Sequence, residues 1–185
     1  SPKWLSSNIK EPISIQPGDK FKLELTLDMN NGRNFGSIRK YIIVQTNDKA
    51  TPAKMIVLQG YVEPYFEAPI KKGKYKKWLA SQPKIKVKEN TVDYGKVNAG
   101  SITKGSVEIS NKGKDTLKIY KLHSQCGCLR IETNKTIILP GEKATITLTF
   151  DSINRKERQR KQAYIITNDP LNKQVIFYTD AFVQI

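Results

Sequence analysis

The sequence predicts an all-β protein built from packed β-sandwich domains, and three observations lead to this fold class. Apolar and polar residues alternate in short segments, as at Leu23, Leu25 and Leu27, whose neighbours are polar. Turn-forming Pro-Gly and Thr-Asn-Asp sequences separate these segments at short intervals. No segment shows the sustained period of an amphipathic helix. Together these features favour sheets over a helical or mixed fold.

An internal repeat organises the chain. Each copy has a Pro-Gly turn, an alternating strand, a basic hairpin loop, a Thr-Asn-Asp sequence that ends an apolar strand, and a closing strand. These segments are 17–18, 21–27, 29–39, 46–48 and 54–62 in the first copy, and 140–141, 144–150, 152–162, 167–169 and 174–184 in the second. Order, spacing and residue types all agree, so chance is a poor explanation. The repeat predicts two related domains in tandem.

The second copy has further strands ahead of its Pro-Gly turn, whereas the first copy has only a short lead-in. About seven strands with closely spaced turns are typical of an immunoglobulin-like sandwich. The added strands are predicted at 91–97, 102–110, 115–123 and 128–133, with a tight turn at 111–113. We therefore predict tandem immunoglobulin-like β-sandwiches: a partial first domain over 1–63, a proline- and lysine-containing linker over 64–83, and a complete domain over 84–185.

The partial first domain is predicted to be unstable alone. Its few strands have one face that is meant for an opposite sheet, and bare apolar side chains would each forfeit roughly 1.5–3 kcal/mol of burial. The residues expected on this face are Leu23, Leu25, Leu27, Ile43, Ile56 and Leu58. We expect the missing half to come either from preceding residues of the same protein or from a partner or second copy that adds strands by β-augmentation.

The chain is strongly basic, with 32 Lys and Arg against 17 Asp and Glu and a net charge of +15. Such an excess indicates either a solvated lysine-rich surface or binding of nucleic acid, anionic lipid or glycan. The charge is spread through every segment and no nucleic-acid motif flanks the densest runs, so we expect a solvated surface and no nucleic-acid partner. The candidate partner-binding residues in these runs are Lys71, Lys72, Lys74, Arg155, Arg158 and Arg160.

Cys126 and Cys128, the two cysteines of the chain, are separated by one glycine, and His123 lies close before them. Residues i and i+2 of a strand face the same way, so both sulfurs should lie on one side. Three interpretations stay open: semi-buried structural thiols, a local disulfide formed in an oxidising compartment, and a zinc or copper(I) site with His123 as third ligand. Because further ligands are lacking, we expect no bound metal or cofactor and place the cysteines at a strand end.

Catalytic motifs are not found in the sequence. It contains no nucleophile elbow, no glycine-rich phosphate loop and no zinc-protease motif. Asp28 and Asp151 end equivalent strands, which favours a turn or capping role over a catalytic pair. We therefore expect a protein that is not an enzyme. No apolar run approaches the ~20 residues of a membrane span, and the sequence shows no signal peptide, as expected of a cytosolic protein or a processed, exported one.

Six landmarks in sequence order resemble a known family. They are Asp93-Tyr-Gly-Lys-Val97, the turn at 111–113, Ser124-Gln-Cys-Gly-Cys128, Leu139-Pro-Gly-Glu142, Phe150-Asp151 and Thr167-Asn-Asp-Pro170. The segment 84–185 is similar to bacterial immunoglobulin-like domains of unknown function with a Ser-Cys-Gly-Cys motif, which are related in architecture to major sperm protein and Hydin-type domains. Here Gln125 and Leu129 flank the cysteines where the family usually has serine and threonine. The opening Ser1-Pro-Lys-Trp4 resembles family sequence that follows such a motif, so the first copy resembles a domain cut at that point.

The resemblance implies a location more than an activity. Members are typically exported to the envelope of Gram-negative bacteria, as periplasmic proteins or outer-membrane lipoproteins. We therefore expect a non-enzymatic binding or scaffolding module that engages an envelope protein through its faces and edges. The alternatives are a metal or redox accessory protein that uses Cys126 and Cys128, and a binder of anionic glycan, lipid or nucleic acid through the basic surface.

Overall fold

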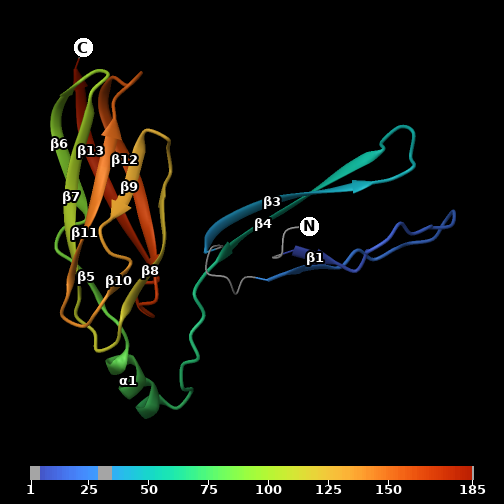
Figure 1. The fold of residues 1–185 in the computed structure, drawn as a ribbon, viewed down its shortest axis with the longest axis horizontal. Coiled ribbons are helices and arrows are strands. Elements are labelled where there is room, and N and C mark those ends of the chain that lie inside the picture. The colour runs from blue at the N-terminus through green and yellow to red at the C-terminus, as the bar shows by residue number, and fades with distance from the viewer. Residues whose placement is uncertain (1–4, 29–34, 185) are drawn as a thin grey trace. The chain divides into compact units, whose positions relative to one another are not determined.

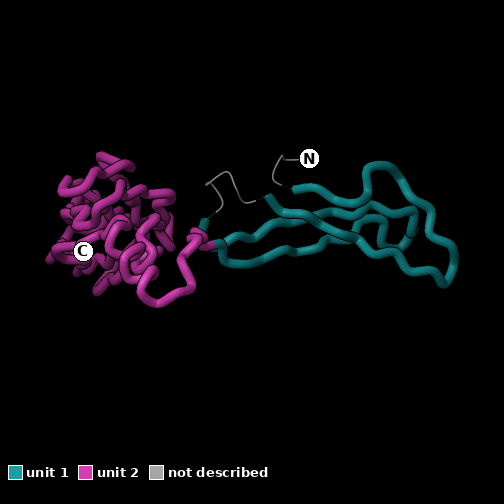
Figure 2. Tube along the Cα trace, turned by 90° about the horizontal axis from the view of Figure 1, so that it is seen from below, with its two compact units in different colours: residues 1–62 teal, residues 63–185 magenta. Residues whose placement is uncertain are grey.

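The chain divides into two compact units, 1–62 and 63–185 (Figure 2), in a computed structural model that describes residues 5–28 and 35–184. The N-terminal unit contains β1 (Leu5–Ser7), β2 (Leu25–Leu27), β3 (Gly36–Gln45) and β4 (Ala53–Val62). The C-terminal unit contains helix α1 (Lys72–Ser81) and strands β5 (Ile85–Val87), β6 (Thr91–Asn98), β7 (Ile102–Asn111), β8 (Leu117–Ser124), β9 (Leu129–Thr133), β10 (Ile137–Ile138), β11 (Lys143–Asp151), β12 (Glu157–Thr167) and β13 (Gln174–Gln184) (Figure 1). The predicted domain limits stay a prediction, because the two units are separated by how compactly their residues are packed and not by an independent test of where each domain begins and ends.

The strands of the C-terminal unit form two sheets that pack face to face (Figure 1). Within the described residues, the larger sheet has the order β10-β8-β12-β13-β6 and the smaller sheet the order β5-β7-β11-β9. Neighbours pair antiparallel, except that β6 runs parallel to β13 at the edge of the larger sheet. The predicted all-β, immunoglobulin-like sandwich is therefore confirmed.

The core of this sandwich follows the predicted alternation. Ile146, Leu148 and Phe150 on β11 are at most 1% exposed. From the opposite sheet, Ile165 on β12 and Phe177 on β13 are both fully buried in the same apolar cluster. Burial of each such side chain contributes roughly 1.5–3 kcal/mol, so the contact between the two inner faces is the main source of stability in this unit.

The predicted turn after β7 is built around one buried polar side chain. Asn111 is fully buried, and its Oδ1 accepts the backbone N–H of Lys84 at 3.2 Å and of Gly113 at 2.9 Å. Its Nδ2 donates to the carbonyl oxygens of Asp115 at 2.8 Å and Ile138 at 3.0 Å. The amide thus satisfies backbone groups from four separate positions, and it ties the entry to β5 to the turn and to β10.

The described part of the N-terminal unit has no comparable core. β1 pairs with β2, and β3 with β4, in separate two-stranded antiparallel sheets. Within the described residues of this unit, Gly36 alone is buried. The expected inner residues Leu23, Leu25 and Leu27 are only half-buried. With two-stranded sheets whose apolar side chains are at most half-buried, the described part of this unit has less apolar packing than the C-terminal sandwich.

One residue of the predicted inner face is assigned wrongly. Ile43 is 66% exposed and pairs with Met55, which is 64% exposed on the same face. Ile42 instead pairs with Ile56, and both are half-buried. Successive side chains of a strand point to opposite faces, so Ile42 and Ile43 cannot share a face. Ile42, and not Ile43, lies on the face that carries Ile56.

The basic hairpin loops are shorter than predicted. Of the predicted loop 29–39, residues 29–34 lie outside the described residues and 36–39 belong to β3; of the loop 152–162, residues 157–162 belong to β12. The partner strands β4 and β13 run far enough to pair with these residues, as Gly36 does with Val62 and Glu157 with Val183. Backbone pairing therefore outweighs the polar composition that favoured a loop.

Two further differences arise in short elements. The predicted strand 21–27 is reduced to β2, because the Asn8 side chain bonds the backbone of Lys22 and Glu24 ahead of it. The predicted linker contains α1, a helix of ten residues with no buried residue and hence no apolar periodicity. The described residues include no helix with the length and apolar character of a membrane span.

The substitution Asn111→Ala is expected to lower the free energy of unfolding of the C-terminal unit by about 2–4 kcal/mol, because it leaves buried backbone groups without partners. Urea unfolding of the full chain measures this loss. Asn134→Ala is the matched control, since Asn134 is exposed and its Oδ1 accepts one bond, from Thr145 N–H at 2.8 Å; it should cost about 1 kcal/mol or less. Equal losses for the two variants would contradict the role given to Asn111.

Candidate functional site

Cys126 and Cys128 lie in the connection between β8, which ends at Ser124, and β9, which begins at Leu129. The two sulfurs form a disulfide, and the Cα atoms are 5.3 Å apart. Gly127 between them is exposed, and a Cβ added there would meet no atom within 4 Å. The turn therefore needs glycine neither for space nor for a positive φ.

Hydrogen bonds hold this turn on the end of the sandwich. The Cys126 carbonyl oxygen accepts the Ser124 hydroxyl at 3.1 Å and the Leu129 N–H at 3.3 Å. The Cys128 carbonyl oxygen accepts the N–H of Asp151 at 2.9 Å. Cys128 is 8% exposed and belongs to the apolar core, whereas Cys126 is half-buried and packs against that core. The disulfide thus runs from the surface into the core.

This geometry corrects one interpretation and leaves another without support. The interpretation as free structural thiols is wrong, because two sulfurs that face the same way across a single residue are close enough to bond.

His123 is exposed on β8 and its ring lies 5.1 Å from the ring of Tyr164. Partial burial and the charge of Lys121 lower the pKa of His123 below its usual value. In the part of the chain that the structure describes, no group of three His, Cys, Asp or Glu side chains is placed to hold a metal ion.

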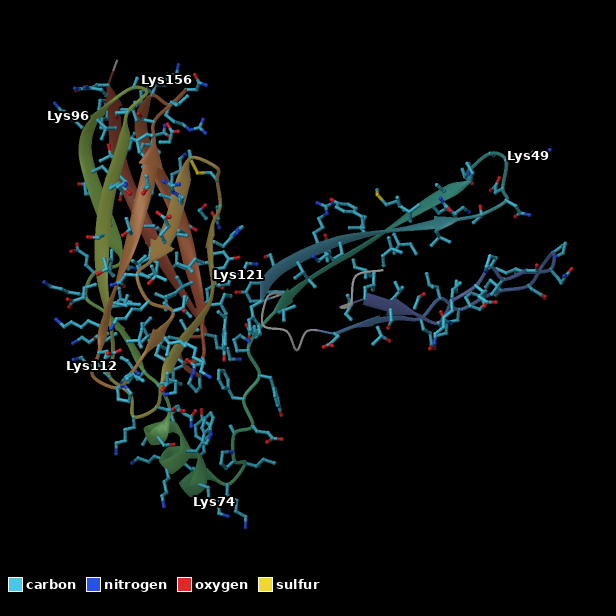
Figure 3. All side chains as sticks on the ribbon, viewed as in Figure 1. Lys49, Lys74, Lys96, Lys112, Lys121 and Lys156 are labelled. Atoms are coloured by element: carbon cyan, nitrogen blue, oxygen red, sulfur yellow. A yellow bond between two sulfur atoms is a disulfide. The ribbon has the colours of Figure 1, made fainter. Side chains whose placement is uncertain are left out.

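The candidate basic residues fall into two separate groups. Lys71, Lys72 and Lys74 lie at the start of α1, where all three are exposed. Arg155 lies in the loop after β11, and Figure 3 shows its neighbour Lys156 at the end of the unit opposite Lys74. The two lysine- and arginine-rich runs therefore do not form a single basic patch.

The arginines after β11 are partly engaged by neighbouring groups. Arg155 Nη1 donates to the carbonyl oxygen of Asn154 at 3.4 Å, beside an open hollow of about 540 Å³. Arg160 lies 3.7 Å from the Asp180 carboxylate and its guanidinium stacks 4.9 Å from the ring centre of Tyr178. Contacts of this kind are expected of a solvated strand face, since exposed ion pairs contribute little.

An apolar surface on the β3–β4 hairpin is the feature that sequence reasoning missed. Tyr41, Ile43 and Met55 are 57%, 66% and 64% exposed, and Val57 is 38% exposed. Ile43 pairs with Met55 and Tyr41 with Val57, so the four side chains are contiguous on one face. The other face of the same hairpin carries Ile42, Val44, Ile56 and Leu58, which are half-buried. The run from Tyr41 to Val44 is apolar at every position, and this absence of alternation is the signal for a strand that is apolar on both faces.

Comparison with known proteins places the chain in a family. Residues 85–183 match the family described as a protein of unknown function (DUF1573), and the chain belongs to that family. This confirms the expected membership of a family of unknown function. No curated protein matches the sequence.

Solved structures support the fold alone. A protein of unknown function from Porphyromonas gingivalis W83 is 18% identical with a TM-score of 0.63, over 98% of this chain and 81% of that one. Weaker likenesses include the ASH/PapD-like domain of human CEP192, at 10% identity and a TM-score of 0.47 over 65% of this chain and 94% of that one. Another is WR4 of the C. elegans MSP family, at 10% identity and a TM-score of 0.35 over 54% of this chain and 97% of that one.

The burial of the two sulfurs predicts an order of reactivity after reduction. Cys126 should be alkylated faster than Cys128 in the folded, reduced chain, by a factor on the order of 10, because Cys128 lies in the core and Cys126 does not. Mass spectrometry of peptides after timed iodoacetamide treatment measures both rates. Unfolding in urea is the control and should equalise them. Equal rates in the folded chain, or faster modification of Cys128, would contradict the placement of the two side chains.

Proposed function

We propose that the chain is a non-enzymatic binding or scaffolding module of the bacterial cell envelope, which engages protein partners through its sheet faces and edges. The observation that carries the proposal is the β3–β4 hairpin. Contiguous apolar side chains are exposed on one face, and each strand has a single neighbour within the described residues. Exposed apolar surface and open sheet edges are the features by which β-proteins bind extended segments of other proteins.

The state of the cysteines supports a non-enzymatic role. A cysteine nucleophile would need a free thiolate, and both sulfurs here are tied to each other. His123, the histidine that could activate one, instead lies against the ring of Tyr164. These contacts favour a structural role for the motif, in which the disulfide fixes the turn between β8 and β9.

The disulfide also supports an exported location. Disulfides persist in oxidising compartments such as the bacterial periplasm and are rare in the cytosol. The two bonded cysteines are separated by one residue and lie in a turn. Reduction of this disulfide would free the half-buried thiol of Cys126. We therefore propose an exported protein with tandem immunoglobulin-like domains, which is either periplasmic or held at the outer membrane as a lipoprotein.

A second candidate function rests on α1. The helix exposes Lys72, Lys74, Lys76 and Lys77 within about one and a half turns, next to Lys71. Such a cluster suits an anionic glycan or lipid head group, and its binding would fall steeply with salt. The proposal of protein binding through β3–β4 does not depend on these lysines, so the two functions can be separated by experiment.

Photo-crosslinking in the native bacterium tests the leading proposal. A benzophenone amino acid in place of Ile43 should give discrete products with added protein mass in the envelope fraction, because this position is exposed on the apolar face. The matched control is Leu171, an apolar residue of the C-terminal unit that is 60% exposed, where few products are expected.

Two further arms identify the source of any product. The products at position 43 should persist when Lys72 and Lys74 are both changed to Glu, because binding through β3–β4 does not use these lysines; loss of the products in this variant would contradict that independence. Crosslinks at position 43 that are no more frequent than at 171, that add no mass, or that occur only in the cytosolic fraction would contradict the proposal.

A further inference from the structure

The β3–β4 hairpin has the same pairing register as the β12–β13 hairpin, which is flanked by β8 and β6 in its sheet. Val44 pairs with Lys54 as Ile165 pairs with Val175 in β12–β13. The correspondence holds along the hairpins, through Ile42 with Ile56 and Ala163 with Phe177, to Gly36 with Val62 and Glu157 with Val183. Register is fixed by the turn and by the apolar pattern, so equal registers make the two hairpins comparable position by position.

The turns of the two hairpins are also bonded alike, with one difference. In both, the aspartate N–H donates to the threonine hydroxyl two residues earlier, at 3.3 Å for Asp48 to Thr46 and 3.1 Å for Asp169 to Thr167. Asp169 Oδ2 also accepts the N–H of Ile85 at 2.9 Å, a bond from β5 outside the hairpin. Asp169 is 1% exposed, whereas Asp48 is exposed. The same turn is thus covered by added strands in one unit and bare in the other.

The C-terminal unit shows what covers the edges of such a hairpin. β8 pairs antiparallel with β12, and β6 pairs parallel with β13. In that sheet Thr91 lies opposite Tyr178, and Val97 lies opposite Val183. Within the described residues, β3 and β4 have no neighbour on their outer edges. An edge in this state is a template for another strand.

The faces of the two hairpins differ in the same way. Ala163, Ile165 and Phe177 are fully buried against the opposite sheet. The corresponding Ile42, Val44 and Ile56 are equally apolar and remain half-buried. A strand that pairs along the hairpin and carries alternate apolar side chains would extend this face and place its apolar side chains beside those of β4.

Charge decides between the two edges of the hairpin. β3 carries Arg39 and Lys40 in its middle, and charged side chains are a common protection of an edge strand. β4 carries one charged residue, Lys54, near its beginning, and the rest of the strand is uncharged. The edge of β4 is therefore the better acceptor. It corresponds to the edge of β13, along which β6 runs parallel.

We propose that β4 is a docking site for an extended segment of another protein, which adds to the sheet as a parallel strand with the alternating apolar chemistry of β6. In β6 this chemistry is Val92 and Tyr94 and, after a shift in the pairing register, Val97; all three pack on the core. The inference rests on the proposed binding function and names its partner class, a strand-forming segment. It also sets the direction of that strand, because the register places the partner's start near Val57 and its end near Val62.

The test uses the full chain and a fluorescent synthetic peptide with the sequence of residues 89–100. Anisotropy should show saturable binding, and a scrambled peptide of equal composition should not bind. Ile56→Asp should weaken binding at least ~10-fold, because it places a carboxylate on the apolar face that the peptide's side chains would extend. Gln59→Asp is the matched control on the opposite face, where β13 carries Asp180, and it should leave the affinity within about twofold.

A second measurement does not depend on the folding of any variant. A benzophenone at the peptide position of Thr91 should crosslink the unmodified chain near Val57, and one at the position of Val97 should crosslink it near Val62. The reverse order, crosslinks confined to β3 or to the C-terminal unit, or no binding of the peptide would each overturn the inference. So would a peptide-free dimer in sedimentation, because a second copy would then cover the edge. Failure here, with protein crosslinks at position 43 retained in cells, removes this inference and leaves the proposed function standing.

Discussion

The contact between the inner faces of the two sheets is the interaction on which the C-terminal unit depends. A β-sheet with one apolar face becomes stable when that face is removed from water, and here β11 supplies Ile146, Leu148 and Phe150 to meet Ile165 and Phe177. The buried amide of Asn111 fixes one end of this sandwich by bonding backbone groups. The turn that carries the disulfide is anchored to β11 through the bond between Cys128 and Asp151.

The same constraint explains the chemistry of the N-terminal unit. Its hairpin β3–β4 has the register of β12–β13 and apolar residues at the corresponding inner positions, which are half-buried rather than enclosed in the described part of the unit. Apolar side chains also occupy the outer face, with Ile43 and Met55 about two-thirds exposed. A surface of this kind is costly in water unless something binds it. The proposed binding function follows from this exposed apolar surface. The disulfide in the other unit supports the proposal that the protein works in an oxidising compartment outside the cytosol.

Sequence patterns predicted the elements whose burial alternates and missed those that depend on the rest of the fold. The strands around Ile146 and Val107 were predicted within one or two residues, since alternation reports one buried face. Helix α1 buries no residue and left no period to detect, and the short strand β5 is defined by its pairing with β7. Residues 41–44 are all apolar, so the sequence does not show which of them point to the inner face, and Ile43 was assigned to the wrong face. The pairing of Cys126 with Cys128 was one of three open alternatives, because residue types alone do not fix whether two neighbouring sulfurs bond.

Hydrogen exchange of the chain without any ligand tests most directly the claim that β3–β4 is the uncovered counterpart of β12–β13. The two hairpins have the same backbone pairing, so any difference in amide protection reports the packing around them. The paired amides of β12 and β13 should exchange only when the sandwich opens, and at least ~100-fold more slowly than those of β3 and β4. Equal protection of the two hairpins in a monomeric chain would show that the N-terminal hairpin is already covered, and would contradict the account.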